Sequence, residues 1–183
     1  MKILVAVDGK PASAAALKAA AQLTERLNAE LAVVTVRSGT HATEAPPPVG
    51  VEVAAADRQE LPEGIQLLLR AADTLTALGM LAPVETIKLR DLPHGHVFAV
   101  PRAGAGQVVF SERFGSIVEE LNHEIEENRL DLVVIASPRR GPLGRFAPMN
   151  LPRRLALDLH CSFLVVRHGT PDDRYVVCAD GSP

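Results

Sequence analysis

The sequence predicts an α/β domain in which a parallel β-sheet carries helices on both faces. Short runs of β-branched and aliphatic residues alternate along the chain with longer segments whose aliphatic residues recur at helical spacing. Hydrophobic residues make up 47% of the 183 residues and aromatic residues only 3%, so aliphatic side chains must fill the core. Strands buried on both faces are apolar along their whole length, and these runs therefore favour a parallel sheet.

The first third of the chain predicts a strand, a helix and a second strand. Residues 2–7 form an apolar run that ends in an Asp-Gly pair, a common turn sequence. Residues 12–28 show the period of an amphipathic helix, and residues 31–36 are a second β-branched run. The connection 37–62 contains three consecutive prolines and is longer than an ordinary loop of about 4–6 residues.

The middle third predicts helices at 63–78 and 111–129, separated by an exposed strand and a hairpin. Charged and hydrophobic residues alternate over residues 84–90, which indicates a strand at an edge of the sheet. Residues 91–110 contain two short apolar runs around a turn rich in Gly and Pro, the pattern of an inserted β-hairpin. We expect this hairpin to project beyond the sheet as an interaction surface, because two isolated strands cannot bury its apolar residues.

A strand at 131–136, a helix at 151–160 and a strand at 162–166 complete the series. Repeated strand–helix units joined by right-handed crossovers form a doubly wound sheet. The sequence therefore predicts a doubly wound parallel sheet of five strands with the hairpin inserted into it.

Charge and composition exclude several classes of protein. The formal net charge is −3, which gives no reason to expect nucleic acid or an anionic membrane as a partner. No apolar stretch approaches the roughly 20 residues that a membrane span requires. The two cysteines are too few for a disulfide framework and fit a reducing compartment. We therefore expect a cytoplasmic protein.

Three segments resemble the universal stress protein family: VAVDG at 5–9, DLVVIAS at 131–137 and CSFLVVR at 161–167. The resemblance covers residues 1–167, interrupted by the 37–62 connection and the hairpin. It implies a sheet of order 3-2-1-4-5, with a nucleotide cleft where the order reverses between the first and fourth strands. The same location follows from the general rule that open α/β sheets bind ligands at such a switch point.

ATP-binding members of this family carry a Gly-two-Gly-nine-Gly-Ser/Thr pattern in the loop after the fourth strand. Here these positions fall on Ala136, Arg139, Met149 and Asn150. Glycines let backbone N–H groups approach phosphate closely, and the side chains found here place a Cβ in that space. The sequence therefore predicts that conventional ATP binding is absent.

Other positions are candidates for binding a ligand. The resemblance places Asp8 beside the adenosine and Val36 at the position whose backbone contacts adenine. Five arginines crowd residues 139–154, and they form either an anion site built from side chains or a solvated basic loop. The candidate ligand-binding residues are Asp8, Val36, Ala136, Ser137, Arg139, Arg140 and Asn150.

No metal ion, resident cofactor or catalytic residue is predicted, and ATP or AMP is the alternative ligand. His94 and His96 flank a glycine without a matched third ligand, so we interpret them as loop residues. Cys161 enters a core strand and is interpreted as a buried structural thiol. The acidic residues of the third helix are interpreted as its solvated face: Glu119, Glu120, Glu124, Glu126 and Glu127.

The sequences of the last predicted strand and of the C-terminal tail predict that the chain pairs with a second domain or subunit. Residues 163–166 are apolar, and in this family the fifth strand often pairs with its copy in a second domain or subunit. Residues 174–183, RYVVCADGSP, resemble the start of the chain, so we expect a domain at 1–167 and, at 168–183, a linker and the first strand of a second repeat. Apolar edges invite pairing. The candidate dimer-edge residues are Phe163, Leu164, Val165, Val166, Tyr175 and Val177.

These observations favour a non-catalytic stress-response or regulatory module that acts through a homodimer, a second stress-protein domain or another protein partner, with a small anionic ligand. The competing hypothesis is a switch that binds ATP or AMP and hydrolyses it weakly. A third is a subunit of an electron-transfer flavoprotein, for which no flavin contact can be identified.

Overall fold

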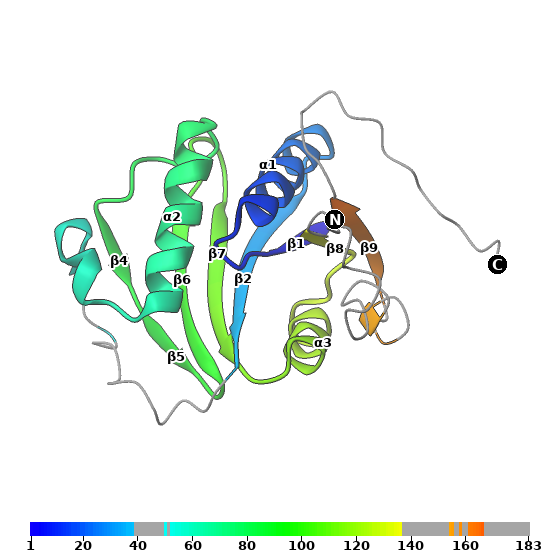
Figure 1. Ribbon diagram of the computed structural model, residues 1–183. Helices are drawn as coiled ribbons and strands as arrows, with labels where there is room; N and C mark the ends of the chain where they lie inside the picture. Colours follow the sequence, from blue (N-terminus) through cyan, green and yellow to red (C-terminus); the bar gives the residue numbers. More distant parts are fainter. Residues whose placement is uncertain (39–49, 51, 137–153, 156–157, 159–160, 167–183) are drawn as a thin grey trace.

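The computed structural model describes residues 1–38, 50, 52–136, 154–155, 158 and 161–166, drawn in colour in Figure 1. Within them the chain forms a sheet of seven strands in the order β5-β6-β7-β2-β1-β8-β9 and a second sheet of two strands, β3 and β4. The elements are β1 (Lys2–Ala6), α1 (Pro11–Arg26), β2 (Glu30–Arg37), β3 (Glu52–Ala54), the 3-10 helix η2 (Ala55–Glu60), α2 (Glu63–Ala77), β4 (Thr86–Lys88), β5 (Arg90–Leu92), β6 (Gly95–Pro101), β7 (Gln107–Phe114), α3 (Ile117–Asn128), β8 (Leu132–Ala136) and β9 (Ser162–Val166).

Five of the seven strands are parallel and form the centre of the fold. β1 pairs with β2 on one side and with β8 on the other, β2 pairs with β7, and β8 pairs with β9. Numbered along the chain, these five strands lie in the order 3-2-1-4-5. The predicted class, a doubly wound α/β domain, is confirmed, and the predicted helices at 12–28 and 63–78 correspond to α1 and α2.

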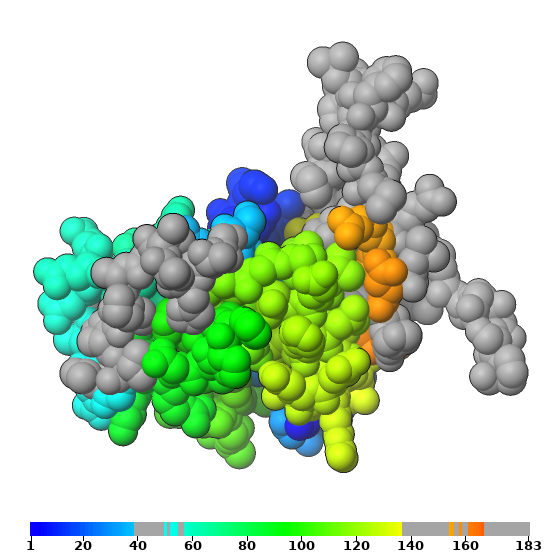
Figure 2. Space-filling view, turned by 90° about the horizontal axis from the view of Figure 1, so that it is seen from below, coloured from blue at the N-terminus to red at the C-terminus, as the bar shows by residue number. Residues whose placement is uncertain are grey.

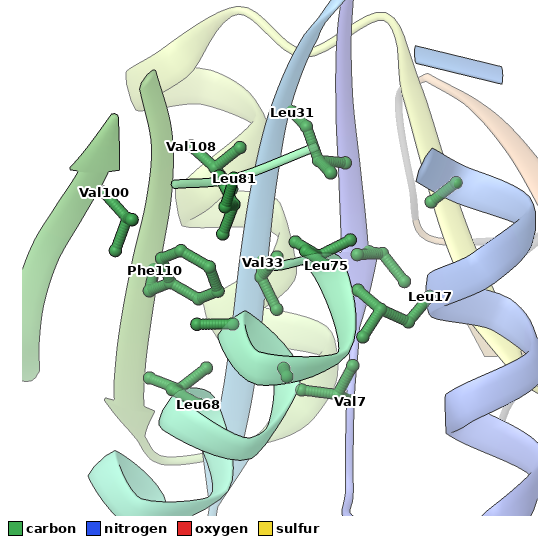
Figure 3. Packing of buried hydrophobic residues seen from close by; sticks show 14 of the residues in the cluster. Val7, Leu17, Leu31, Val33, Leu68, Leu75, Leu81, Val100, Val108 and Phe110 are labelled. Carbon is green, nitrogen blue, oxygen red and sulfur yellow. The ribbon is translucent and has the colours of Figure 1, made fainter. Parts of the chain in front are cut away.

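Helices cover the two faces of the sheet in the way that right-handed crossovers require (Figure 1). α1 and α2 lie on one face, above a cluster of buried residues that includes Ile3, Val5, Leu31, Leu68 and Leu75 (Figure 3). α3 covers the other face, where its buried side chains pack with alternate residues of the same strands. The helix predicted at 151–160 lies mostly outside the described residues.

The third parallel strand is β7, and the prediction that residues 84–90 supply an edge strand of this sheet is wrong. Residues Thr86–Lys88 form β4, which pairs antiparallel with β3 in the separate small sheet. The alternation was read correctly as a strand with one exposed side, because Ile87 is buried while its two neighbours are exposed. Periodicity says nothing about which partner a strand takes.

The hairpin predicted within 91–110 exists, but it does not project from the sheet. β6 and β7 pair antiparallel, β7 pairs in parallel with β2 over six residue pairs, and β5 is the edge strand beyond β6. The ring of Phe98 stacks on that of Phe110 at a centroid distance of 4.9 Å, and both are buried. The apolar residues that suggested an interaction surface are part of the core.

α3 begins later than predicted, because residues 111–114 belong to β7. The chain turns at Gly115, whose φ is +151°, and the helix starts after Ser116. Figure 2 shows α3 in yellow-green across the middle of the face seen from below, with the green β5–β6 segment to one side and the orange residues of β9 to the other. None of the helices in the described part of the chain is long and apolar enough to cross a membrane.

The hairpin's place in the core is testable with Phe98→Ala. We expect this substitution to lower the free energy of unfolding by about 3–5 kcal/mol, the range for removing a buried Phe. Leu78→Ala is the control, because Leu78 is 45% exposed, and we expect a change of less than about 0.5 kcal/mol there. Urea unfolding followed by circular dichroism measures both. A loss below about 1 kcal/mol for Phe98→Ala would mean that the hairpin folds apart from the core.

Candidate functional site

The carboxyl ends of β1, β2 and β8 meet at one edge of the sheet, on either side of the switch point. β1 lies between β2 and β8; α2, which follows β2, lies on one face, and Leu155, a described residue after β8, packs on the other. Asp8 follows β1, Val36 lies near the end of β2, and Ala136 ends β8. The structure thus brings three candidate ligand residues to one edge. Four others lie outside the described residues: Ser137, Arg139, Arg140 and Asn150.

Asp8 closes the turn between β1 and α1. Its Oδ1 accepts a hydrogen bond from the backbone N–H of Lys10 at 3.0 Å, and its Oδ2 lies 3.0 Å from the Lys10 ammonium. Gly9 between them has a φ of +74°, which a residue with a side chain rarely adopts. Pro11 then occupies the first position of α1, where its missing N–H leaves no helical hydrogen bond unmade.

The pKa of Asp8 lies below its ordinary value. Partial burial by itself disfavours the charged carboxylate and is the largest influence. It is outweighed by the combined hydrogen bonds from the Lys10 backbone, the Lys10 side chain and Ser13, together with the positive charge of Lys10. Asp8 is therefore an ionised carboxylate that is already engaged with its own turn.

The three candidate residues at this edge do not converge on one point. Val36 packs with the cluster on the α3 face, whereas Ala136 packs with the cluster beneath α1 and α2. Successive residues along a strand point to opposite faces of the sheet, so positions one step apart along the strand direction contribute to different clusters. The family resemblance assigns the adenine contact to the backbone of Val36, so the direction of the Val36 side chain does not bear on that contact.

A buried charged cluster lies at the same end of the sheet, and sequence reasoning missed it. Glu112 of β7 is fully buried, with Oε2 3.1 Å from Nδ1 of His96 and Oε1 3.7 Å from the guanidinium of Arg37. The other ring nitrogen of His96 lies 3.6 Å from Asp91, and Arg37 also pairs with Glu63 at 3.1 Å. The interpretation of His96 as a loop residue is wrong, because it is a buried residue of β6.

The Glu112 carboxylate lies directly against the first turn of α2. A Cβ built on Gly64 would collide with Glu112 Oε1, so the helix can approach β7 this closely only with glycine at that position. Helix N-termini favour negative charge. Glu112 therefore links β7 to Arg37 of β2, to His96 of β6 and to the first turn of α2, and these polar neighbours offset the cost of burying its carboxyl group.

The opposite face of β7 carries a second polar network. Arg113 donates from Nε to Glu124 at 2.7 Å and from Nη2 to Glu127 at 2.8 Å, and Ser111 donates to Glu124 at 2.8 Å. Asn128 donates to the remaining oxygen of Glu124 at 2.8 Å. Burial alone lowers the pKa of Arg113, but these hydrogen bonds and charges raise it, which keeps the guanidinium charged.

The solvated face predicted for the third helix is therefore wrong at two positions. Glu120 and Glu124 are each about 95% buried, whereas Glu119, Glu126 and Glu127 are exposed as predicted. The succession Ser-Glu-Arg at 111–113 within an apolar run was the available signal. Polar residues on a buried strand need partners of opposite charge on the elements that cover it, and the acidic helix that follows supplies them for Arg113.

The contacts of these buried charged side chains indicate that they stabilise the fold rather than catalyse a reaction. No three or more His, Cys, Asp or Glu side chains in the described part of the chain are placed to hold a metal ion. Cys161 is half-buried, and this burial raises the pKa of its thiol; a hydrogen bond with the Val133 backbone opposes the shift and the negative charge of Asp131 adds to it. A raised pKa disfavours the nucleophilic thiolate.

β9 forms the other end of the main sheet. It pairs in parallel with β8 over Ser162–Val166, and among the described strands none pairs with its outer edge. Phe163, Leu164 and Val165 are half-buried, and Val166 is buried. The tail residues Tyr175 and Val177 lie outside the described residues.

This arrangement agrees with the comparisons with known proteins. A model of the universal stress protein family matches residues 1–167. The chain belongs to the universal stress protein family. It is a stress-response module with that family's α/β fold, and among curated proteins none matches its sequence.

Solved structures of universal stress proteins share this fold. One in complex with cAMP has 19% sequence identity and a TM-score of 0.57, covering 91% of this chain and 97% of that one. One from Archaeoglobus fulgidus has 17% identity and a TM-score of 0.56, covering 91% and 98%. Another from Archaeoglobus fulgidus, in complex with dAMP, has 15% identity and a TM-score of 0.52, covering 91% and 98%.

The lowered pKa of Asp8 predicts a pH-dependent effect of Asp8→Asn. A carboxylate whose pKa is lower in the folded state stabilises the fold above its unfolded pKa, and that contribution disappears as the pH falls through the folded pKa. We expect Asp8→Asn to lower the free energy of unfolding at pH 7 by less than about 1 kcal/mol, as for an exposed ion pair, and to lower the melting temperature accordingly. The difference should begin to shrink as the pH approaches the ordinary aspartate pKa of 3.8 and should vanish only below the lower pKa of the folded state. Calorimetric melting at several pH values measures it, and a gap that persists at the lowest pH would contradict this assignment.

Proposed function

We propose that this universal stress protein is a non-catalytic regulatory module that works as a homodimer joined along β9. The observation that carries the proposal is the apolar outer edge of that strand. Phe163 and Val165 belong to the cluster on the α3 face and Leu164 to the cluster under α1, so apolar side chains flank the edge on both faces. An edge of this kind favours pairing with another strand.

The two ends of the sheet differ in a way that supports this choice. β5, at the opposite end, is three residues long and carries Arg90 and Asp91, both exposed. Short, charged strands are a common protection against edge-to-edge association. β9 is five residues long, and residues 163–166 carry no charge. A second copy of the chain is the partner whose own β9 offers the same complementary surface.

The test is Leu164→Lys, with Leu92→Lys at the β5 edge as the matched control. We expect Leu164→Lys to raise the dimer dissociation constant at least about tenfold, a change of about 1.4 kcal/mol, because a lysine must leave water to remain in the pairing. Leu92→Lys should leave the constant unchanged. Sedimentation equilibrium measures association, and circular dichroism checks that each variant is folded. A wild-type protein that stays monomeric at high concentration would contradict the proposal.

A second candidate function is a nucleotide switch that binds AMP, or that binds ATP and hydrolyses it weakly; of the two, this chain favours a nucleotide with a single phosphate. Asp8 and Val36 at the edge of the sheet support it, and two proteins with this fold were solved with cAMP and dAMP. Neither ligand has a triphosphate. A monophosphate depends less than ATP on the glycine pattern that Ala136, Arg139 and Met149 replace.

Calorimetry with MgATP, AMP and cAMP separates these alternatives. We expect MgATP to bind no more tightly than about 1 mM, because its distal phosphates meet side chains instead of backbone N–H groups. A dissociation constant near 1 μM, about −8 kcal/mol, would contradict the loss of conventional ATP binding. In that case Arg139→Ala with Arg140→Ala tests whether the arginine side chains hold the phosphates.

A further inference from the structure

A pocket of about 130 Å³ lies between α1 and α2, on the face of the sheet away from α3. Its apolar wall is built from Val7 at the end of β1, Leu17 of α1, and Leu67 and Ala71 of α2. Figure 3 shows Val7 and Leu17 lying between the two helices. Val7, Leu17 and Ala71 are buried, so a molecule in the pocket would contact aliphatic carbon over most of its inner surface.

The sequence of α1 explains why the two helices do not close on each other. Its first three turns read PASAAALKAAA, and Ala14 is the residue that faces the pocket between Lys10 and Leu17. Small side chains leave space that a larger aliphatic residue would fill. On the other side, a Cβ built on Gly9 would come within 3.1 Å of Leu67, so the turn after β1 approaches α2 closely and closes one end of the pocket.

The charge available at the pocket is positive and comes from Arg70, because the Lys10 ammonium is already paired with the Asp8 carboxylate at 3.0 Å. Among the described residues that line it, Lys10 and Arg70 are cationic and none is acidic. The acidic residues of α2 are held elsewhere, since Glu63 pairs with Arg37 and Asp73 pairs with Arg58 at 2.6 Å. Within the described part of the chain Arg70 takes part in no ion pair. Its planar guanidinium suits two oxygens of a carboxylate or phosphate.

The pocket is separate from the edge of the sheet where the family resemblance places a nucleotide. Val7 faces the α1–α2 side of the sheet, and Val36 faces the α3 side. Among the described residues, the turn from Asp8 to Lys10 joins the two places, and in it the Asp8 carboxylate lies 3.0 Å from the Lys10 ammonium. A ligand in the pocket therefore depends on neither of the functions proposed above.

We infer that this pocket binds a small organic anion: a carboxylate or phosphate ester attached to an apolar body the size of one ring. The volume is close to that of cavities of about 150 Å³ that accept benzene and well below the roughly 300–1,000 Å³ of drug-sized sites. The apolar wall takes the ring. Arg70, whose side chain is exposed, takes the anionic group, while Lys10 remains paired with Asp8.

Phenyl phosphate is the probe, and two-dimensional NMR of the ¹⁵N-labelled full chain is the measurement. We expect a dissociation constant of about 1 mM for a ligand of this size, with shifts confined to the amides of residues 7–17 and 66–74. Benzamidine, which keeps the ring but is cationic, and inorganic phosphate, which lacks the ring, should each produce at most a small fraction of these shifts.

Two variants test which residues contact the anionic group and which contact the ring. Arg70→Gln keeps an exposed polar side chain and should weaken phenyl phosphate at least about fivefold, whereas Arg26→Gln, at the far end of α1, should leave it unchanged. Ala71→Leu fills the apolar wall and should abolish binding. Shifts that are absent at about 20 mM, that benzamidine reproduces, or that persist unchanged in Arg70→Gln would overturn the inference.

Discussion

The parallel pairing of β7 with β2 is the interaction on which the rest of this structure depends. It adds the third strand to the central sheet, and β7 in turn holds β6 and β5. Each face of β7 then serves a different layer. Phe110 and Glu112 lie on the side of α2, and Ser111 and Arg113 face α3. One strand thus fixes the hairpin and both helical layers.

The polar residues of β7 also constrain its register. A shift of one residue would exchange the two faces of the strand. Glu112 would then leave Arg37 and His96, and Arg113 would leave Glu124, so two charges would be buried without partners. Breaking a buried pair in this way costs about 3–5 kcal/mol. The paired charges therefore exclude the alternative registers that a purely apolar strand would tolerate. The position of α2 follows, because Gly64 leaves just enough room for the Glu112 carboxylate.

The central strands and the helices of the first face were predictable because each has a clear local pattern. Residues 2–7 and 31–36 are uninterrupted apolar runs, and α1 and α2 show helical spacing throughout. β7 was not predictable in the same way. Its sequence, QVVFSERF, begins like a hairpin strand and ends with residues that resemble the start of a helix. The pairing with β2, far away in the sequence, keeps all eight residues in a single strand. At the edge of the sheet, Asp8 was identified because the VAVDG segment resembles the universal stress protein family. The polar contacts of His96 and Glu124, and the burial of Glu120, depend on tertiary packing that no local pattern shows.

β7 joins the hairpin and α2 to the same sheet that carries the candidate edge at β1, β2 and β8. Native-state hydrogen exchange measured by NMR tests this most directly. We expect the amides of β6 and β7 to exchange as slowly as those of β1 and β2, through global unfolding alone. Fast exchange of β6 and β7 while β1, β2 and β8 remain protected would contradict it, because the hairpin would then be an independent addition to the sheet.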